Sequence, residues 1–157
     1  MPTAIEQKVV AYICRFHQGL WQLLVFDQDK GVRSSETQIP MGSAKNENSL
    51  QAALEKAILE ESGLEDLMIV SQIDQYEIQS PTSQKATSTE CRHVFLVIAP
   101  NEERDQWTWH VKGQSTDSTV PCHFHWIPIA QARNLPADLG RSVKSCIQLL
   151  FERQESH

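Results

Sequence analysis

The chain has 157 residues and a formal net charge of −6, and hydrophobic and charged residues make up 40% and 22% of it. These fractions are ordinary for a globular protein, and the length suits a single domain over residues 1–157 with its own core. The acidic balance argues against broad electrostatic binding of a nucleic acid polymer.

The N-terminus and the cysteines favour a cytoplasmic protein. The first residues lack a basic segment followed by an apolar one, and no later apolar run approaches the length of a membrane span. The cysteines are far apart and form no C-x-x-C pair, which favours reduced thiols over a zinc ribbon or a disulfide framework. They are Cys14, Cys91, Cys122 and Cys146.

Two apolar runs near the N-terminus predict a β-hairpin. Residues 9–16 and 20–26 are rich in β-branched and aromatic residues and flank a short polar turn. The polar segment that follows leads to Pro40 and Gly42, which predict an irregular path for residues 39–42.

A helix is predicted over residues 49–62. Asn48 followed by Gln51 has the pattern of an N-cap with the polar partner of a capping box. Gly63 suits the left-handed position beyond the last turn.

One carboxylate on this helix breaks its amphipathic pattern. At about 100° per residue, Glu61 falls near the middle of the apolar stripe and Glu60 at its edge. A carboxylate that faces the core must be paired, hydrogen-bonded or bound to a cation, so Glu61 is the first candidate functional residue. The stripe consists of Ala53, Leu54, Ala57 and Ile58.

The remainder of the chain predicts four more strands and a C-terminal helix. Polar loops are expected over residues 80–90 and 112–119. The order of strands, helix, strands, helix favours an α/β fold with a mixed sheet between helices. The strands are residues 67–78 with an irregularity near Gln72, 93–99, 107–111 and 122–129 with Pro128 near its end, and the helix is residues 138–152.

Other strand residues are further candidates. Trp107 and Trp109 share a strand face and could stack on a nucleobase, although packing is the alternative. His123 and His125 also share a face and could share a metal, or form an ordinary strand pair. Cys122 stands beside them, but adjacent strand residues face opposite sides, which argues against a cysteine nucleophile with a histidine base.

Residues 42–64 resemble the Nudix box, whose pattern is Gly, five residues, Glu, seven residues, Arg-Glu, an aliphatic residue, any residue, Glu-Glu, any residue, Gly and an aliphatic residue. The spacing is kept, and the likeness extends over roughly residues 6–152. The resemblance implies a Nudix-like α/β/α sandwich. The matching positions are Gly42, Ile58, Glu60, Glu61, Gly63 and Leu64.

Three box positions depart from the family pattern. Asn48, Lys56 and Ala57 stand where the family has Glu, Arg and Glu. The family Arg and first Glu brace the loop against the helix, whereas Lys56 could give Asn48 only a single-point contact. At Ala57 the chain loses one of three carboxylates on one helix face and keeps Glu60 and Glu61.

The resemblance implies a hydrolase of a nucleoside diphosphate linked to another group, with Mg²⁺ or Mn²⁺ on Glu60 and Glu61. Such cations prefer oxygen ligands, screen the polyanion and lower the pKa of the attacking water. Gly42 is then expected beside the substrate, and Lys56 either meets phosphate or stays solvated. The substrate's identity and the oligomeric state stay open, a homodimer included.

The loss at Ala57 leaves three alternatives. Removing a preorganised electrostatic group lowers turnover by about 10²–10³, so an active enzyme is slow or needs a replacement carboxylate. Glu47, one residue before the box position, is the best-placed candidate for a catalytic role near the helix start. A ligand or base could instead come from a loop, and the third alternative is an inactive nucleotide-binding or sensor module. The loop candidates are Glu90, Asp105 and Asp117.

Overall fold

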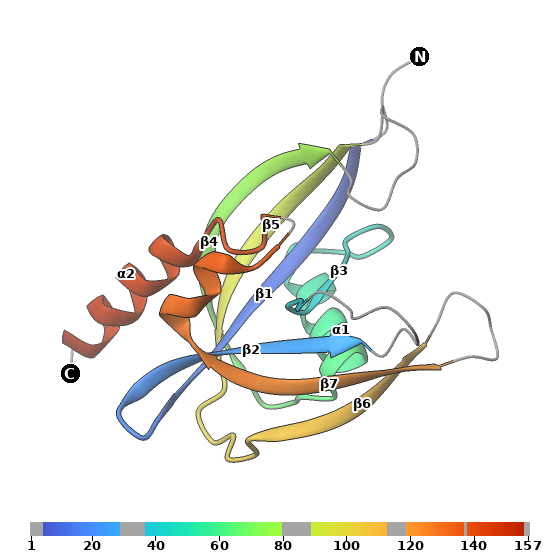
Figure 1. The fold of residues 1–157 in the computed structure, drawn as a ribbon. Coiled ribbons are helices and arrows are strands. Elements are labelled where there is room, and N and C mark those ends of the chain that lie inside the picture. Colours follow the sequence, from blue (N-terminus) through green and yellow to red (C-terminus); the bar gives the residue numbers. More distant parts are fainter. Residues whose placement is uncertain (1–4, 29–36, 80–88, 113–118, 137, 156–157) are drawn as a thin grey trace.

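The computed structural model describes residues 5–28, 37–79, 89–112, 119–136 and 138–155 and shows a sheet with helices on both sides (Figure 1). The helices are α1 (Leu50–Ser62), the short 3-10 helix η1 (Ile129–Asn134) and α2 (Val143–Glu155). The strands are β1 (Ile5–His17), β2 (Leu20–Gln28), β3 (Met41–Ser43), β4 (Met68–Gln79), β5 (Thr89–Ile98), β6 (Gln106–Lys112) and β7 (Thr119–Pro128).

The long strand β1 lies at the centre of the sheet. Six of the seven strands follow the order β4-β5-β1-β2-β7-β6, and the seventh, β3, pairs with β1. β1 runs parallel to β5, whereas the other strand pairs in the described part of the chain are antiparallel. Residues 8–10 of β1 pair with β3, and residues 14–17 pair with β2. The predicted mixed sheet is confirmed. The pairing of β3 with β1 also holds the start of the box, at Gly42, against the centre of the sheet.

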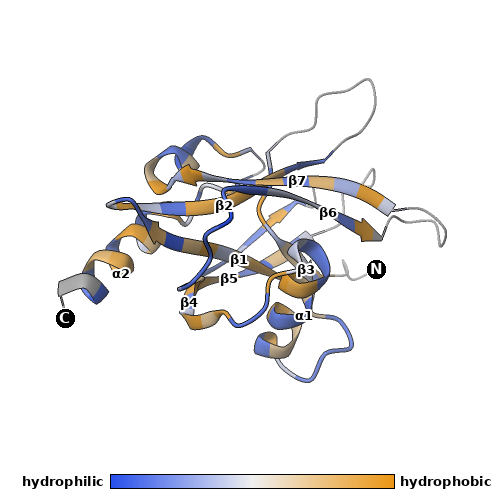
Figure 2. Cartoon of the chain, turned by 90° about the horizontal axis from the view of Figure 1, so that it is seen from below, coloured by the Kyte–Doolittle hydropathy of each residue, from blue (hydrophilic) through white to orange (hydrophobic). Residues whose placement is uncertain are grey.

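Alternation along β1 divides the apolar residues between two cores. Val9, Ala11 and Ile13 belong to the core that packs against α1, while Val10 and Tyr12 belong to the core under α2. α1 and α2 lie on opposite sides of β1, and both mix hydrophobic and hydrophilic residues along their length (Figures 1 and 2). The predicted α/β/α layering is confirmed, since each helix buries one apolar face against the sheet.

Several predicted elements have their predicted positions. β1 and β2 form the hairpin, with Gly19 in the turn at a φ of 82°. β4 shifts register between Ile69 and Ser71 and again between Gln72 and Asp74, which confirms the irregularity near Gln72. Pro128 is the last residue of β7.

Other elements differ from the prediction. The C-terminal helix begins at Val143 rather than residue 138, because Asp138 adopts a left-handed φ of 62° and a turn carries Leu139 into the core. Residues 129–134, the first of which falls in the last predicted strand, form a 3-10 helix, and residues 41–43 of the box entry form β3. Most of the two loops predicted at 80–90 and 112–119 lies outside the described residues, and their described ends belong to strands: residues 89–90 to β5, 112 to β6 and 119 to β7. No helix in the described ranges is both long and apolar enough to cross a membrane.

Candidate functional site

Caps at both ends fix the position of α1. The N-cap is Ser49, not Asn48 as predicted: Ser49 has an extended backbone, and its hydroxyl accepts the Ala52 N–H at 3.0 Å. The helix therefore starts one residue later, and Gln51 is not the partner of a capping box. Gly63 has the predicted left-handed conformation at a φ of 78°, and its N–H donates to the Leu59 carbonyl at 3.0 Å.

Glu61 turns toward the sheet, as its place on the helix predicts. Its carboxylate is partly buried, and Oε1 accepts the backbone N–H of Met41, the first residue of β3, at 3.0 Å. Burial raises the pKa of Glu61 from 4.5 to about 7; the Met41 N–H and the positive charge of Lys8 lower it, and the charge of Glu60 raises it. At neutral pH Glu61 can exchange a proton or bind a cation.

Glu60, the neighbouring acid, has a different environment. Its side chain is exposed, while its backbone carbonyl accepts the indole N–H of Trp109 at 2.9 Å. The last turn of α1 therefore offers one solvated carboxylate and one that is partly desolvated, on adjacent residues.

Ala57 is part of the core that packs against α1. It is 6% exposed, and a Cβ placed on Gly42 would lie only 2.5 Å from the Ala57 Cβ. A glycine is thus required at position 42 because β3 approaches the helix closely. This packing role explains Gly42 without any contact to a substrate. Ala57 fills the position of the absent carboxylate with an apolar contact.

Glu47 and Lys56 hold the loop against the helix. Lys56 Nζ lies 3.0 Å from Glu47 Oε1, and Glu47 raises the pKa of Lys56. The acid that braces the loop is thus Glu47, one residue before Asn48, the position at which the sequence allowed Lys56 only a single-point contact. The Lys56 side chain is 59% exposed and that of Glu47 20%, so the contact lies at the rim of the site.

Trp107 packs rather than presenting an open stacking face. One side of its ring stacks on Phe124, with ring centroids 5.3 Å apart and planes 9° apart, and the guanidinium of Arg104 lies 4.4 Å from its centroid. Its indole N–H donates to the Ser62 carbonyl at 3.1 Å. The sequence pattern places Trp107 and Trp109 on one strand face but does not show that this face meets α1 or what covers the Trp107 ring.

Trp109 also contacts the end of α1. Its six-membered ring occupies the space above Gly63, where an added Cβ would lie 2.6 Å from the ring. The indole is 37% exposed, so part of it remains open to solvent. Trp107 and Trp109 thus donate to two backbone carbonyls in the last turn of α1, where carbonyls have no partner within the helix. The two indoles therefore hold the segment that carries Glu60 and Glu61.

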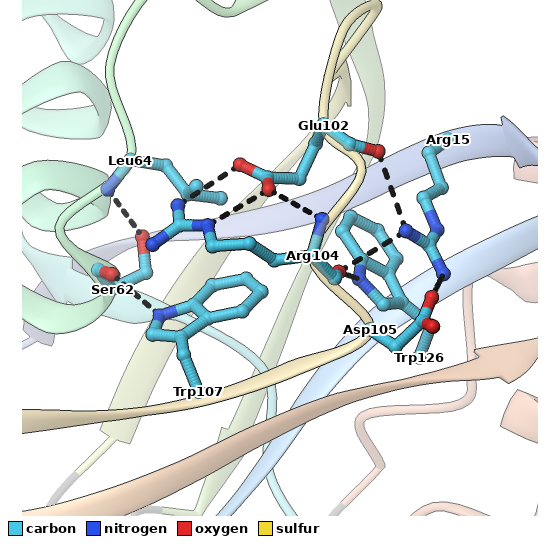
Figure 3. Close-up of polar contacts among 8 residues, drawn as sticks. All are labelled: Arg15, Ser62, Leu64, Glu102, Arg104, Asp105, Trp107 and Trp126. Atoms are coloured by element: carbon cyan, nitrogen blue, oxygen red, sulfur yellow. Dashed lines mark hydrogen bonds and ion pairs between the residues drawn. The ribbon is translucent and has the colours of Figure 1, made fainter.

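Arg15 fixes the turn that leads into β6 (Figure 3). Arg15 is 3% exposed, and its guanidinium donates to the backbone carbonyls of Glu102 and Arg104 at 3.3 and 3.1 Å. It also lies 4.5 Å from the Trp126 ring centroid and 2.9 Å from the Asp105 carboxylate, where it holds the pKa of Asp105 below its usual range. Asp105 is therefore engaged in an ion pair rather than free to serve as a metal ligand.

Glu90, a second loop candidate, does not supply a ligand near α1 either. Glu90 lies in β5 and is 4% exposed, and its carboxylate pairs with Arg92 Nε at 2.8 Å. Arg92 also contacts Tyr76, a residue of the core under α2, which places this pair on the sheet face opposite α1. The suggestion that Glu90 is a loop ligand is therefore wrong. Asp117 lies outside the described residues.

The histidines of β7 face away from α1, whereas Cys122 faces its core. His123 Nδ1 lies 3.1 Å from the Thr108 hydroxyl, and His125 Nδ1 lies 4.0 Å from Asp27. Within the described segments no group of three or more His, Cys, Asp or Glu side chains is placed to hold a metal. The expected opposition of Cys122 and the histidines is confirmed, and these residues make neither a catalytic dyad nor a metal cluster.

A cavity of about 550 Å³ lies between the start of β1 and the end of β3. Sequence reasoning missed it, because the predicted first strand began at residue 9 and excluded the polar residues before it. Gln7 continues the inward alternation of Val9 and Ala11, and this is the signal that could have identified it. Among the described residues the cavity is lined by Ile5, Glu6, Gln7, Lys8, Ser43, Ala44 and Lys45.

No protein-family model and no curated protein matches the sequence, whereas solved structures match its fold. An Ap4A hydrolase of C. elegans superposes with a TM-score of 0.66 at 12% identity, covering 94% of this chain and 99% of the other. The Nudix domain of Shewanella oneidensis NrtR, solved with ADP-ribose, gives 0.63 at 14% identity over 94% and 89%.

A Listeria monocytogenes protein described as a Nudix hydrolase gives a TM-score of 0.67 at 13% identity over 93% of this chain and 94% of its own. These matches span nearly the whole chain, and their identities are too low to carry a substrate across. The chain has the Nudix fold, with the box on β3 and α1.

Proposed function

We propose that this protein binds a nucleoside diphosphate linked to another group and hydrolyses the diphosphate with the help of Mg²⁺ or Mn²⁺. The observation that carries the proposal is Glu61, a partly buried carboxylate on the box helix whose pKa is about 7. Such a group destabilises the fold when it is charged, and a bound cation would relieve that cost. The cytoplasmic location expected from the sequence belongs to the same proposal.

The donor set fits one hard cation rather than a cluster. Glu60 and Glu61 supply carboxylate oxygens, and Ala57 supplies none. Mg²⁺ is commonly held by one or two carboxylates together with water and substrate phosphates, so these two acids suffice if the nucleotide completes the site. When bound, the cation would screen the diphosphate and lower the pKa of the attacking water.

The chain's other residues position these acids and the ligand. The Glu47–Lys56 ion pair braces the loop on α1, and Trp107 and Trp109 hold the last turn in place. We assign nucleobase contact to the open part of the Trp109 ring and not to Trp107, whose ring lies between Phe124 and Arg104.

A second candidate is a nucleotide-binding or sensor module without turnover. It is favoured by the apolar contact between Ala57 and Gly42, which fills the position of the family's third carboxylate. In that case Glu60 and Glu61 would bind the ligand's cation without placing an attacking water.

A substrate panel separates the two candidates. Purified protein is incubated with ADP-ribose, Ap4A, nucleotide sugars and nucleoside triphosphates, with Mg²⁺, Mn²⁺ or EDTA, and products are separated by chromatography. The hydrolase predicts metal-dependent cleavage of a diphosphate link that falls by about 10²-fold or more in Glu61→Gln. Glu65→Gln, an exposed acid just beyond the helix, is the matched control and should retain activity.

The same panel is run as a thermal unfolding assay. A rise in melting temperature with a nucleotide and no product would establish the binding module, because a ligand that binds only the native state stabilises it. If no compound is cleaved and none raises the melting temperature, both candidates are rejected.

A further inference from the structure

Two cysteines from distant parts of the chain meet in the core under α2. Cys14 lies in β1, at the centre of the sheet, and Cys146 lies in α2, 132 positions later in the chain. Both residues are 0% exposed, and their Sγ atoms lie 3.8 Å apart. All four cysteines of the chain are free thiols in this structure. The packing of α2 on the sheet thus brings two thiols into direct contact.

The hydrogen bonds around the pair are those of two protonated thiols. Cys14 donates its proton to the Tyr12 carbonyl, with its Sγ 3.8 Å from the oxygen, and its sulfur therefore accepts the proton of Cys146. Burial, and after it the contact with Cys146, raises the pKa of Cys14 well above its ordinary value. Because the thiolate is the reactive form, the closed core keeps the pair reduced.

A disulfide between these two residues needs only a small movement. The sulfur atoms must approach from 3.8 Å to the S–S distance of about 2 Å. Rotation of the two side chains and a small shift of α2 can supply this approach. Since α2 contributes no strand to the sheet, it can move or open without breaking a strand ladder.

The other two cysteines do not compete for this bond. Cys122 belongs to the core that packs against α1, on the other side of the sheet. Cys91 contacts the ring of His93, with its Sγ 3.7 Å from Nε2. Among the described residues, which include all four cysteines, no other pair of cysteine sulfur atoms is in contact. The structure therefore defines one disulfide pairing.

We infer that Cys14 and Cys146 are a latent disulfide pair that locks α2 to β1 when the protein is oxidised by hydrogen peroxide. The peroxide O–O bond breaks as one thiol becomes a sulfenic acid, and one water leaves. The sulfur of the second thiol then attacks this sulfur, the S–O bond breaks, and a second water leaves. Two thiols and one peroxide thus give one disulfide and two waters. The reaction takes place when α2 opens, because only then can a thiolate form and meet the oxidant.

The disulfide would stabilise the oxidised protein and then be protected by it. It closes a loop that contains most of the chain, from β1 to α2, and so lowers the entropy of the unfolded chain. Once α2 closes again, the core under it covers the bond and keeps thiol reductants away. The pair lies on the sheet face opposite α1, so this lock is independent of the proposed function.

Peptide mapping of the wild-type protein tests the pairing and needs no variant to fold. Folded, reduced protein is treated with hydrogen peroxide, the remaining thiols are alkylated, and a tryptic digest is analysed by mass spectrometry without reduction. The four cysteines fall in four different tryptic peptides, and we expect residues 9–15 to be linked to residues 145–153 within one chain. Prolonged treatment that leaves Cys14 and Cys146 free, oxidises them without linking them, or links other cysteines would overturn the inference.

Thermal unfolding of oxidised and reduced samples tests the lock. Oxidation should raise the melting temperature of wild type by about 5–15 °C and should not raise that of Cys14→Ala or Cys146→Ala. Cys91→Ala and Cys122→Ala, the matched controls, should gain stability as wild type does. Comparing the two samples of each variant removes the packing loss that the substitution itself causes, and all variants receive the same peroxide. A linked wild type whose melting temperature is unchanged or lower would overturn the lock.

Reduction of the linked protein tests the protection by the core. Dithiothreitol should open the disulfide at least about 10-fold faster in denaturant than in buffer, because the native core must first open. Equal rates in the two solutions would show an exposed bond and overturn this part of the inference.

Discussion

At Glu61 folding stability and the proposed function oppose each other, because the charged carboxylate destabilises the fold and is also the form that would bind a cation. Its pKa is about 7 in the folded protein and 4.5 ordinarily. Between these values the folded protein keeps a proton that the unfolded chain has released, so the free energy of unfolding falls as pH rises through this window. The loss amounts to up to about 3 kcal/mol by pH 8.

Denaturant unfolding in EDTA between about pH 5 and pH 8 measures this loss. Wild type and the control Glu65→Gln should lose stability with rising pH, and Glu61→Gln should show a much flatter profile. Adding Mn²⁺ with pyrophosphate at pH 8 should restore part of the stability of wild type and not of Glu61→Gln. A flat wild-type profile would contradict the assignment of a raised pKa to Glu61.

Ala57 allows the missing carboxylate to be replaced. In Ala57→Glu the new side chain must pass Gly42 and leave the core, so in EDTA the variant should be less stable than wild type by roughly 2–3 kcal/mol. With Mn²⁺ the carboxylate gains a cation, and we expect tighter Mn²⁺ binding and turnover raised by up to about 10²-fold. Electron paramagnetic resonance gives the Mn²⁺ affinity.

The matched control for this substitution is Ala53→Glu, one turn earlier on the same buried face of α1. It should be destabilised in the same way but gain neither metal affinity nor turnover, because no other box carboxylate lies next to it. If the two variants gain Mn²⁺ affinity and turnover equally, position 57 does not lie beside a cation site.

At the scale of elements, β6 determines where α1 ends. The indoles of Trp107 and Trp109 donate to the Ser62 and Glu60 carbonyls, so the strand bonds to the turn that carries the acids. Trp109→Phe keeps a ring over Gly63 but removes the donor, which should cost about 1 kcal/mol of stability. It should also loosen the last turn, raising amide hydrogen exchange at residues 61–63 and weakening Mn²⁺ binding in the presence of pyrophosphate.

Trp126→Phe is the control for this strand contact, since Trp126 also donates to a carbonyl, that of Arg104 at 2.9 Å, but away from the acids. It should lower stability to a similar extent while leaving Mn²⁺ binding unchanged. If the two variants weaken Mn²⁺ binding equally, the effect of Trp109 is general destabilisation rather than positioning.

Across the whole molecule, the sequence predicts the features that depend on the repeat of a helix or a strand. It misses the features that depend on contacts between residues far apart in the chain. The 3.6-residue repeat turns Glu61 toward the sheet, and the two-residue repeat puts Trp107 and Trp109 on one face of β6. What covers Trp107 is set by Phe124 and Arg104. The contact between Gln7 and His93 joins residues 86 positions apart, across the parallel pairing of β1 and β5. Neither repeat contains this information.

Arg15 shows how one long-range contact joins these parts. From the sheet centre it holds the turn at residues 101–105, and that turn leads directly into β6 and so to the end of α1. Arg15→Lys keeps the charge near Asp105 but loses the planar fork that reaches two carbonyls and stacks on Trp126. We expect a loss of about 2–3 kcal/mol in the free energy of unfolding, measured by denaturant titration.

Asp105→Asn separates the fork from the ion pair. The Asp105 side chain is 76% exposed, so its pairing with Arg15 is screened by water and this variant should lose no more than about 1 kcal/mol. Arg15→Lys should also raise hydrogen exchange at residues 101–106, whereas Asp105→Asn should not. Equal losses in the two variants would mean that the ion pair, and not the bonds to the turn's backbone, holds this turn against the sheet.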